Sequence, residues 1–129
     1  MSRSLKAFAA DGRFETMILF DGKIIGSIGF HDLDGVNRCA HVGYWIAYEY
    51  EGKGIVTRCC RALVDYLFDT MKLNRVQINC NVENVRSRAV PERLGFKLEG
   101  IQRQAEFLHD RFGDWAVYAL LREEWKLAT

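Results

Sequence analysis

The feature that most constrains this chain is a change of hydrophobic period between residues 44 and 82. Residues 44–51 are typical of the end of a strand, Gly52-Lys53-Gly54 of a turn, and a helix is expected to begin near Val56. One face of that helix is continuously apolar and contains Val56, Cys59, Cys60, Leu63, Val64, Leu67, Phe68 and Met71. Residues 75–82 then alternate strictly between apolar and polar side chains. This order of strand, helix and strand predicts a right-handed crossover between two parallel strands.

The residues before this unit predict an antiparallel meander. Strands are expected over residues 14–20, 23–31 and 39–47. Asp21-Gly22 is a strong signal for a two-residue hairpin turn between the first two strands. Residues 32–35 are expected to form a loop, and residues 1–11 carry apolar side chains at the spacing of the end of a helix.

The residues after the crossover predict a short helix and a closing hairpin. Asn74 is expected to end the long helix in the left-handed conformation, and Gly95 to end a helix over residues 84–94 that contains Pro91. Strands over residues 96–108 and 115–122 are expected to pair around a loop at residues 109–114. The order β-β-β-α-β-α-β-β predicts an α/β (α+β) fold with a mixed, mostly antiparallel twisted sheet around a central β-α-β unit. The whole chain of 129 residues is expected to form a single domain.

Composition and charge argue against several classes of function. Lys and Arg number 18 against 17 Asp and Glu, so the whole-domain charge favours neither nucleic acid nor an anionic membrane. No apolar run approaches the length of a membrane span. The four cysteines and three histidines lack the spacing of a zinc site, so no metal is expected, and His31, His41 and His109 are interpreted as structural or exposed. The cysteines are interpreted as reduced, which favours the cytoplasm.

The glycine turn allows several interpretations. Two glycines followed by a helix start present backbone N–H groups that suit a phosphate. A Walker A loop needs its lysine after the last glycine and a hydroxyl next to it, but Lys53 lies between the glycines and Ile55 follows Gly54. A dinucleotide fingerprint needs a third glycine where Thr57 stands. A phosphate site and a plain strand-to-helix turn both stay open on these residues alone.

Four further motifs, in order along the chain, add to the glycine turn. From Val42 to Leu121 the sequence resembles the GNAT acetyltransferases, and in particular the Rim-type branch that acetylates the N-terminal amine of ribosomal proteins. The matching segments are Gly43-Tyr44-Trp45-Ile46, Gly52-Lys53-Gly54-Ile55-Val56-Thr57, Asn84-Val85-Arg86-Ser87-Arg88, Glu92-Arg93-Leu94-Gly95-Phe96-Lys97-Leu98-Glu99-Gly100 and Gln104-Ala105-Glu106-Phe107. The resemblance implies a GNAT-like fold and acetyl-CoA as co-substrate, with its pyrophosphate on the amides of residues 52–56.

The resemblance also implies catalytic roles. It assigns the general base to Glu106, whose plain alternative is a strand carboxylate that faces solvent or pairs with an arginine. It assigns protonation of the leaving thiolate to Ser87, which could equally cap the short helix, with Tyr118 as an alternative acid or a core residue. A backbone N–H near Ile46 or Ala47 would stabilise the oxyanion. Direct transfer in a ternary complex is expected, without an acetyl-cysteine intermediate.

A larger set of residues is implied to hold the coenzyme. Asn84 would bond the pantetheine arm, and Arg86 or Arg88 would reach a phosphate. The full implied set is Tyr44, Ile46, Ala47, Gly52, Lys53, Gly54, Ile55, Val56, Thr57, Asn84, Arg86 and Arg88. The sequence departs from the family pattern at the outer turn positions, where Glu51 is expected to point to solvent and Val56 to narrow the turn.

The acceptor and the assembly follow from the same resemblance. The acceptor is expected to be the N-terminal α-amine of a protein, most specifically a ribosomal protein. A small-molecule amine such as a polyamine is an alternative, as is a catalytically idle acyl-CoA-binding or assembly module. The family usually begins with a strand and two helices, and this chain is expected to start near the end of the second helix. A homodimer or larger homo-oligomer is therefore expected to cover the gap.

Overall fold

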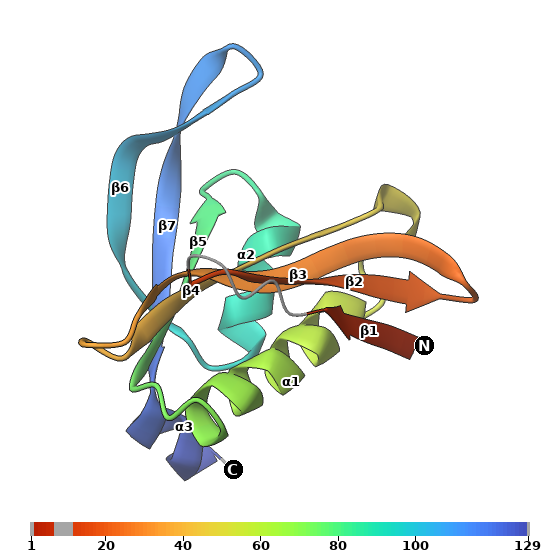
Figure 1. Ribbon diagram of the computed structural model, residues 1–129. Helices are drawn as coiled ribbons and strands as arrows, with labels where there is room; N and C mark the ends of the chain where they lie inside the picture. The colour runs from red at the N-terminus through yellow and green to blue at the C-terminus, as the bar shows by residue number, and fades with distance from the viewer. Residues whose placement is uncertain (1, 7–11, 129) are drawn as a thin grey trace.

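The computed structural model describes residues 2–6 and 12–128, which form one mixed sheet with helices packed on it (Figure 1). Seven strands of these residues lie in the order β1-β2-β3-β4-β5-β7-β6. The strands are β1 (Ser2–Lys6), β2 (Phe14–Phe20), β3 (Lys23–Asp34), β4 (Cys39–Ile46), β5 (Arg75–Asn81), β6 (Lys97–Leu108) and β7 (Arg111–Leu121). The helices are α1 (Ile55–Asp69), α2 (Val85–Arg93) and α3 (Arg122–Ala128), with a 3₁₀ turn, η1, at Tyr48–Tyr50.

The strand pairings confirm the predicted fold class. β2, β3 and β4 form the expected antiparallel meander, and β5, β7 and β6 pair antiparallel at the other end. The two halves join through one parallel pair, β4 with β5, which α1 connects. The glycine turn and α1 therefore lie at the crossover between β4 and β5 in the middle of the sheet, and α2 makes a second crossover from β5 past β7 to β6.

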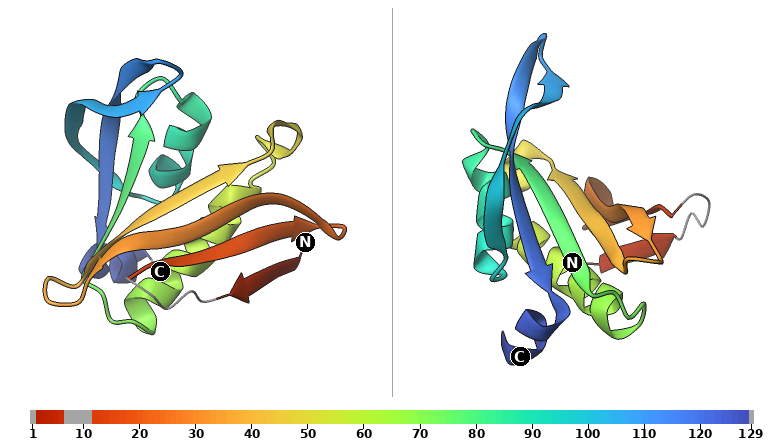
Figure 2. Two further views of the ribbon diagram at one scale, coloured as in Figure 1. Left: turned by 45° about the horizontal axis from the view of Figure 1, so that its top comes forward. Right: turned by 90° about the vertical axis from the view of Figure 1, so that its left-hand side faces the viewer.

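The parallel pair is short, and this opens the sheet. β4 pairs with β5 only at Cys39–Arg75, Ala40–Val76 and His41–Gln77. β4 nevertheless continues to Ile46 and β5 to Asn81. Figure 2 shows the two strands diverging from their paired ends, with α2 beside β5. Both carboxyl ends thus leave unpaired backbone facing an opening, which is where ligands bind in open α/β sheets.

The predicted helix face forms much of the core. Seven of the eight predicted residues are buried in α1, together with Ile55: Val56, Cys59, Cys60, Leu63, Val64, Leu67 and Phe68. Met71 lies beyond the end of α1 at Asp69 and is partly buried against the core. Each large aliphatic or aromatic side chain among the buried residues contributes about 1.5–3 kcal/mol by leaving water. Trp125 of α3 packs on Phe68 with ring centroids 6.1 Å apart, and its Nε1 donates to Asp65 Oδ1 at 2.8 Å. These contacts fix α1, and with it the glycine turn, against the sheet.

Two turn predictions are confirmed in detail, and the structure adds a helix cap that was not assigned from the sequence. Asp21 and Gly22 both have positive φ, 50° and 78°, as a tight hairpin turn between β2 and β3 requires. Gly95 follows α2 with φ 85°. Asn84 caps α2 by accepting from the amide of Ser87 at 3.0 Å.

Other local predictions are wrong. Ser2–Lys6 is a strand that pairs with β2, so the expected helix end is absent there, and the rest of that prediction lies outside the described residues. Residues 32–34 extend β3 instead of forming a loop. The left-handed residue after α1 is Lys72, with φ 59°, and not Asn74, whose amide donates to Arg38 O. β1 covers the edge of β2.

The hairpin at the end of the chain is tighter and longer than predicted. His109 and Asp110 have φ 54° and 59°, so β6 and β7 join by a two-residue turn and β7 begins at Arg111. Asp and His tolerate the left-handed region better than most side chains do. The hairpin projects beyond the rest of the molecule (Figure 1). Over the described residues, no helix is long and apolar enough to cross a membrane.

Candidate active site

The glycine turn is a backbone cradle at the start of α1. Gly52 and Gly54 both have φ 75°, a conformation that other residues adopt only with strain. Gly54 is the N-cap of α1 and no side chain caps that end. The first amides of α1, at Ile55, Val56 and Thr57, therefore have no intrahelical acceptor. They combine with the positive end of the helix dipole to favour an anion.

A pocket of about 440 Å³ opens in front of this cradle. It lies between the end of β4, the start of α1 and the start of α2, and is called here the glycine-turn pocket. Its lining includes ten residues expected from the sequence: Tyr44, Ile46, Gly52, Gly54, Ile55, Val56, Thr57, Asn84, Arg86 and Ser87. Ala47, Lys53 and Arg88 are not in the lining. The Lys53 ammonium lies over the Tyr50 ring, 5.6 Å from its centroid.

Arg86 and Glu51 face each other beside the cradle. Arg86 Nε lies 3.5 Å from Glu51 Oε2, so Glu51 pairs with an arginine instead of pointing to solvent as expected. A Cβ at Gly52 would come within 2.8 Å of Arg86 Nη1. Gly52 is thus needed both for its conformation and for the approach of this guanidinium. Arg86 is a positive charge beside the cradle that would favour an anion, and Glu51 opposes it. Arg58 is a second one, since its Nη1 lies 3.6 Å from the position of a Cβ at Gly54.

The start of α2 and the end of β5 carry a small polar cluster. Ser87 Oγ lies 3.5 Å from Cys80 Sγ, and the Tyr44 hydroxyl donates to Ser87 O at 2.8 Å. Burial raises the pKa of the Tyr44 hydroxyl and of the Cys80 thiol, so both stay protonated at neutral pH. Because Asn84 is the cap of α2, the cap role considered for Ser87 is wrong. Its hydroxyl donates to Cys80 Sγ, and Ser87 lines the pocket.

Tyr118 and Arg88 occupy a different position. Tyr118 is 1% exposed, and its hydroxyl accepts from Arg88 Nε at 2.9 Å and donates to Glu92 Oε2 at 2.8 Å. Arg88 Nη1 also donates to Val82 O at 3.0 Å. Burial raises the pKa of Tyr118. These groups tie α2 to β5 and β7, and neither Tyr118 nor Arg88 lines the glycine-turn pocket.

Glu106 is held at the carboxyl end of β5. Asn81 Nδ2 donates to Glu106 Oε1 at 3.0 Å, and Asn81 Oδ1 accepts from the amide of Glu83 at 2.9 Å. Asn81 and Asn84 line one hollow of about 410 Å³, and Asn84 also lines the glycine-turn pocket. The carboxylate therefore lies at the same end of the sheet as the cradle.

A bulge in β6 sets the direction of Glu106. The register of β6 against β7 shifts between Gln102 and Glu106, and Gln104 has φ 51°. The Gln104 amide donates to Asp114 Oδ1 at 2.8 Å, which stabilises this conformation. Bulges of this kind redirect side chains next to active sites. A non-glycine residue in the left-handed region is a strain that a functional role would explain.

A second groove lies on the other side of the end of β4. It measures about 630 Å³ and shares Tyr44 and Trp45 with the glycine-turn pocket; it is called here the β3–β4 groove. Its lining is Arg13, Phe14, Glu15, Ser27, Gly29, Phe30, His31, Gly43, Tyr44 and Trp45. No sequence motif predicts this groove, because most of its residues come from three different strands, β2, β3 and β4. The glycines at 29 and 43 were the available signal.

The backbone at the end of β4 offers one of the two predicted oxyanion donors. The Ala47 amide donates to Ile25 O at 2.7 Å, so it is not available to a ligand. Successive amides of a strand point to opposite edges. The Ile46 amide is therefore directed to the β5 side, into the opening where β4 and β5 have separated.

Comparisons with known proteins agree with this geometry. A family model described as an acetyltransferase (GNAT) domain matches residues 1–97. The chain is 49% identical to the putative ribosomal N-acetyltransferase YdaF of Bacillus subtilis (strain 168), over 87% of this chain and 61% of that protein. It is 38% identical to the ribosomal-protein-serine acetyltransferase of Escherichia coli (strain K12), over 80% and 58%. A spermidine N(1)-acetyltransferase of the same strain is 30% identical over 71% and 47%.

Solved structures give the same result. A crystal structure of a probable acetyltransferase matches with a TM-score of 0.88 and 47% identity, over 92% of this chain and 66% of that one. The microcin C7 self-immunity acetyltransferase MccE, solved with acetyl-CoA and AMP, matches with a TM-score of 0.80 and 34% identity, over 85% and 61%. The chain spans about three fifths of the length of the two ribosomal-protein acetyltransferase relatives named above. It belongs to the GNAT family of acetyltransferases, enzymes that use acetyl-CoA.

Proposed function

We propose that this protein transfers the acetyl group of acetyl-CoA to the N-terminal α-amine of a protein, most specifically a ribosomal protein, within a ternary complex. The glycine-turn pocket holds the coenzyme and the β3–β4 groove receives the amine. Tyr44 and Trp45 stand between the two. The observation that supports this proposal is the separation of β4 and β5 beyond their three paired positions, next to Tyr44 and Trp45, the two residues that line both pockets.

The coenzyme is held by backbone more than by side chains. The amides at the start of α1 donate hydrogen bonds to the pyrophosphate, and Arg86 adds positive charge when it leaves Glu51. Asn84 and Ser87 at the start of α2 flank the pantetheine arm. Arg88 takes no part, because its guanidinium is bound to Tyr118 and Val82.

The chemistry needs three groups around the thioester. Glu106 accepts a proton from the amine, directly or through one water; an α-amine has a pKa of about 7.7–8.0, so a modest base suffices. The nitrogen forms a bond to the acetyl carbon, the Ile46 amide stabilises the oxyanion, and the carbon–sulfur bond breaks. The departing thiolate, whose pKa is about 8.5, needs only a hydrogen bond, which Ser87 donates, and it takes its proton from solvent. Ser87 lines the pocket and Tyr118 does not.

The charge of the β3–β4 groove favours a single amine over a polyamine. Among the described residues that line it, Glu15 is the only carboxylate, and Arg13 lies beside it. A polyamine carries several positive charges and needs several carboxylates, and Arg13 would repel it. A single α-amine at the end of an extended peptide needs only one carboxylate. The likeness to a spermidine acetyltransferase makes the polyamine the alternative to test.

An amine panel separates these acceptors. Mass spectrometry of mixtures with acetyl-CoA should find acetylation of the α-amine of peptides that copy ribosomal protein N-termini, at rates at least tenfold above spermidine. Peptides with a blocked α-amine and a free lysine should stay unmodified. Faster acetylation of spermidine would overturn the acceptor assignment, and the absence of any product would support an idle coenzyme-binding module.

We also propose a cytoplasmic homodimer. Among the described residues the cysteines form no disulfide, as a reducing compartment would maintain. The β6–β7 hairpin exposes Phe107 and Phe112, at 60% and 62%, with their rings 5.0 Å apart. Exposed aromatic pairs of this kind are typical of an interface. Light scattering should give twice the chain mass, and a Phe107→Ser, Phe112→Ser variant should give the monomer; a monomeric parent protein would contradict this.

A further inference from the structure

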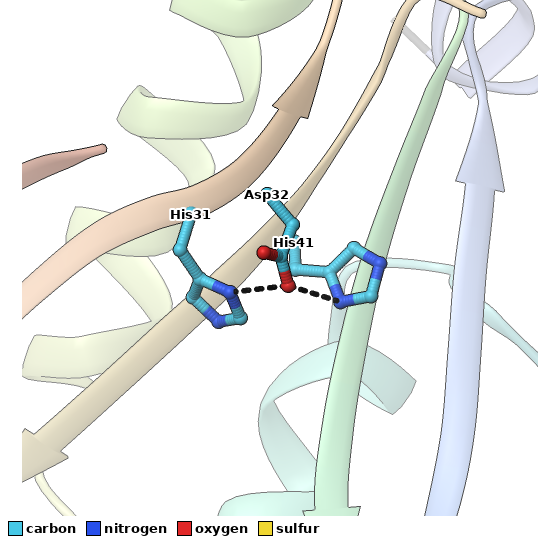
Figure 3. Close-up of side chains that lie close together, drawn as sticks. All are labelled: His31, Asp32 and His41. Atoms are coloured by element: carbon cyan, nitrogen blue, oxygen red, sulfur yellow. Dashed lines mark hydrogen bonds and ion pairs between the residues drawn. The ribbon is translucent and has the colours of Figure 1, made fainter. Parts of the chain in front are cut away.

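The side chains of His31, Asp32 and His41 point toward one another (Figure 3). They lie near the end of β4 that pairs with β5. Asp32 Oδ2 lies 3.1 Å from His31 Nδ1 and 4.0 Å from His41 Nδ1. One ligand atom from each of the three residues lies within 4.8 Å of the other two. The cluster plays no part in the coenzyme pocket, and no sequence motif predicts it.

The backbone brings these side chains together by two separate features. His31 and His41 are directly opposite in the β3–β4 ladder, so their rings share one face, with centroids 5.5 Å apart. Asp32 would normally point to the opposite face, because side chains alternate along a strand. The register shifts between His31 and Asp34, and Asp32 has φ 53°. This bulge turns the carboxylate back to the face of the two imidazoles.

The distances suit a small divalent ion. Zinc binds imidazole nitrogen at about 2.0–2.1 Å and carboxylate oxygen at about 2.0–2.2 Å, so ligand atoms around a tetrahedral ion lie about 3.3–3.5 Å apart. The two observed distances, 3.1 Å and 4.0 Å, bracket that separation. The side chains of Asp32, His31 and His41 are 72%, 46% and 27% exposed, so an ion can enter and keep a water as fourth ligand.

The surrounding charge also permits a cation. Arg75 lies close enough to His41 to act on it electrostatically, so its positive charge would repel a bound metal ion. Its guanidinium donates to both carboxylate oxygens of Glu99, at 2.8 Å and 2.7 Å, and to Gln77 Oε1 at 2.8 Å. The positive charge of Arg75 is therefore neutralised by a bidentate partner. The charge of Asp32 remains for the ion.

We propose that His31, Asp32 and His41 form a binding site for one divalent transition-metal ion of the zinc class. Zinc-class ions bind well to a set of two imidazoles and one carboxylate, whereas Mg²⁺ and Ca²⁺ favour oxygen ligands. His31 also lines the β3–β4 groove, so a bound ion would lie at the wall of that groove. The ion takes no part in acetyl transfer.

Calorimetric titration of the metal-free protein with Zn²⁺ tests the site, and Co²⁺ absorption reports the geometry. We expect one ion per chain, tetrahedral Co²⁺ bands, and no comparable binding of Mg²⁺. His31→Ala, His41→Gln and Asp32→Asn should each weaken Zn²⁺ at least about tenfold, since even loss of an outer-shell partner costs about 10–100-fold. Asn tolerates the left-handed backbone of position 32, so that variant keeps the fold.

Two control variants make the test specific. His109→Ala removes the remaining histidine, at the exposed tip of the β6–β7 hairpin, and should leave Zn²⁺ affinity unchanged. Cys39→Ser removes the half-buried thiol on the same strand as His41 and should also leave it unchanged. Absence of saturable binding, full affinity in a His31→Ala, His41→Gln double variant, or loss of binding in either control would overturn the proposal.

Discussion

The Asn81 side chain donates a hydrogen bond of 3.0 Å to the carboxylate of Glu106, and the Glu83 amide fixes the orientation of that side chain. The bond crosses from the end of β5 to β6, over Gly113 of β7. A Cβ at Gly113 would come within 2.6 Å of Asn81 Nδ2. Gly113 lies opposite Glu106 in the ladder, so this glycine makes the contact possible.

Gly113→Ala should therefore disturb Glu106 without touching the coenzyme pocket. The new methyl group displaces the Asn81 amide, and we expect kcat to fall about tenfold. This loss is smaller than the decrease of about 10²-fold or more that removal of a general base causes, because Glu106 is still present. KM for acetyl-CoA should stay within twofold. Gly100→Ala is the matched control, because a Cβ there meets nothing within 4 Å. Equal kcat in the two variants would remove Asn81 from the positioning of Glu106.

Glu51→Gln should strengthen coenzyme binding. The substitution removes a negative charge beside the cradle and releases Arg86, which Glu51 now holds at 3.5 Å. An exposed ion pair is worth up to about 1 kcal/mol, so the Kd for acetyl-CoA should fall about two- to fivefold in calorimetry at low salt. Glu99→Gln breaks the ion pair with Arg75 outside both pockets and should leave the Kd unchanged. Weaker binding by Glu51→Gln would mean that Glu51 itself supports the coenzyme.

Ser87 and Tyr118 are separable by substitution. Tyr118→Phe removes the hydroxyl that joins Arg88 and Glu92, and should lower the free energy of unfolding in urea by about 1–3 kcal/mol. Its kcat on folded protein should change less than twofold, because the hydroxyl does not line the glycine-turn pocket. Ser87→Ala should instead lower kcat with little loss of stability. The reverse pattern would assign protonation of the thiolate to Tyr118.

The four thiols should differ in reactivity. Burial raises the pKa of the Cys60 thiol to about 12 and also raises that of Cys80. Alkylation proceeds through the thiolate, so both should resist iodoacetamide at pH 8 while half-buried Cys39 reacts. Peptide mass spectrometry against time gives the order, and labelling in urea provides the control in which all four react. Rapid labelling of Cys80 in the folded protein would show that the end of β5 opens.

The sequence predicted best where local periodicity and tertiary packing agree. The apolar face of α1 is buried as a unit, and the alternation of β5 leaves Val76, Ile78 and Cys80 buried. Gly95 follows α2 with a positive φ, as predicted for the end of that helix. These features depend on neighbours in the sequence, so the pattern alone contains them.

The sequence predicted least where a residue takes a rare conformation to suit a partner far along the chain. The Gln104 backbone takes a left-handed conformation, which is stabilised because its amide donates a hydrogen bond to the side chain of Asp114, ten residues later. Asp32 turns between two imidazoles that only the β3–β4 register brings together. The β3–β4 groove has the same origin, since Glu15, Ser27 and Tyr44 come from three strands. No spacing along the sequence encodes these arrangements.

The role of Glu106 is tested most directly by comparing the parent protein with Glu106→Gln in single-turnover acetyl transfer and in acetyl-CoA calorimetry. Gln keeps the shape and the hydrogen bond to Asn81 but cannot accept the amine proton at neutral pH. We predict a rate about 10²–10⁴-fold lower with the Kd for acetyl-CoA within twofold. An unchanged rate, with acetyl-CoA bound equally well, would contradict the assignment of Glu106 as the general base.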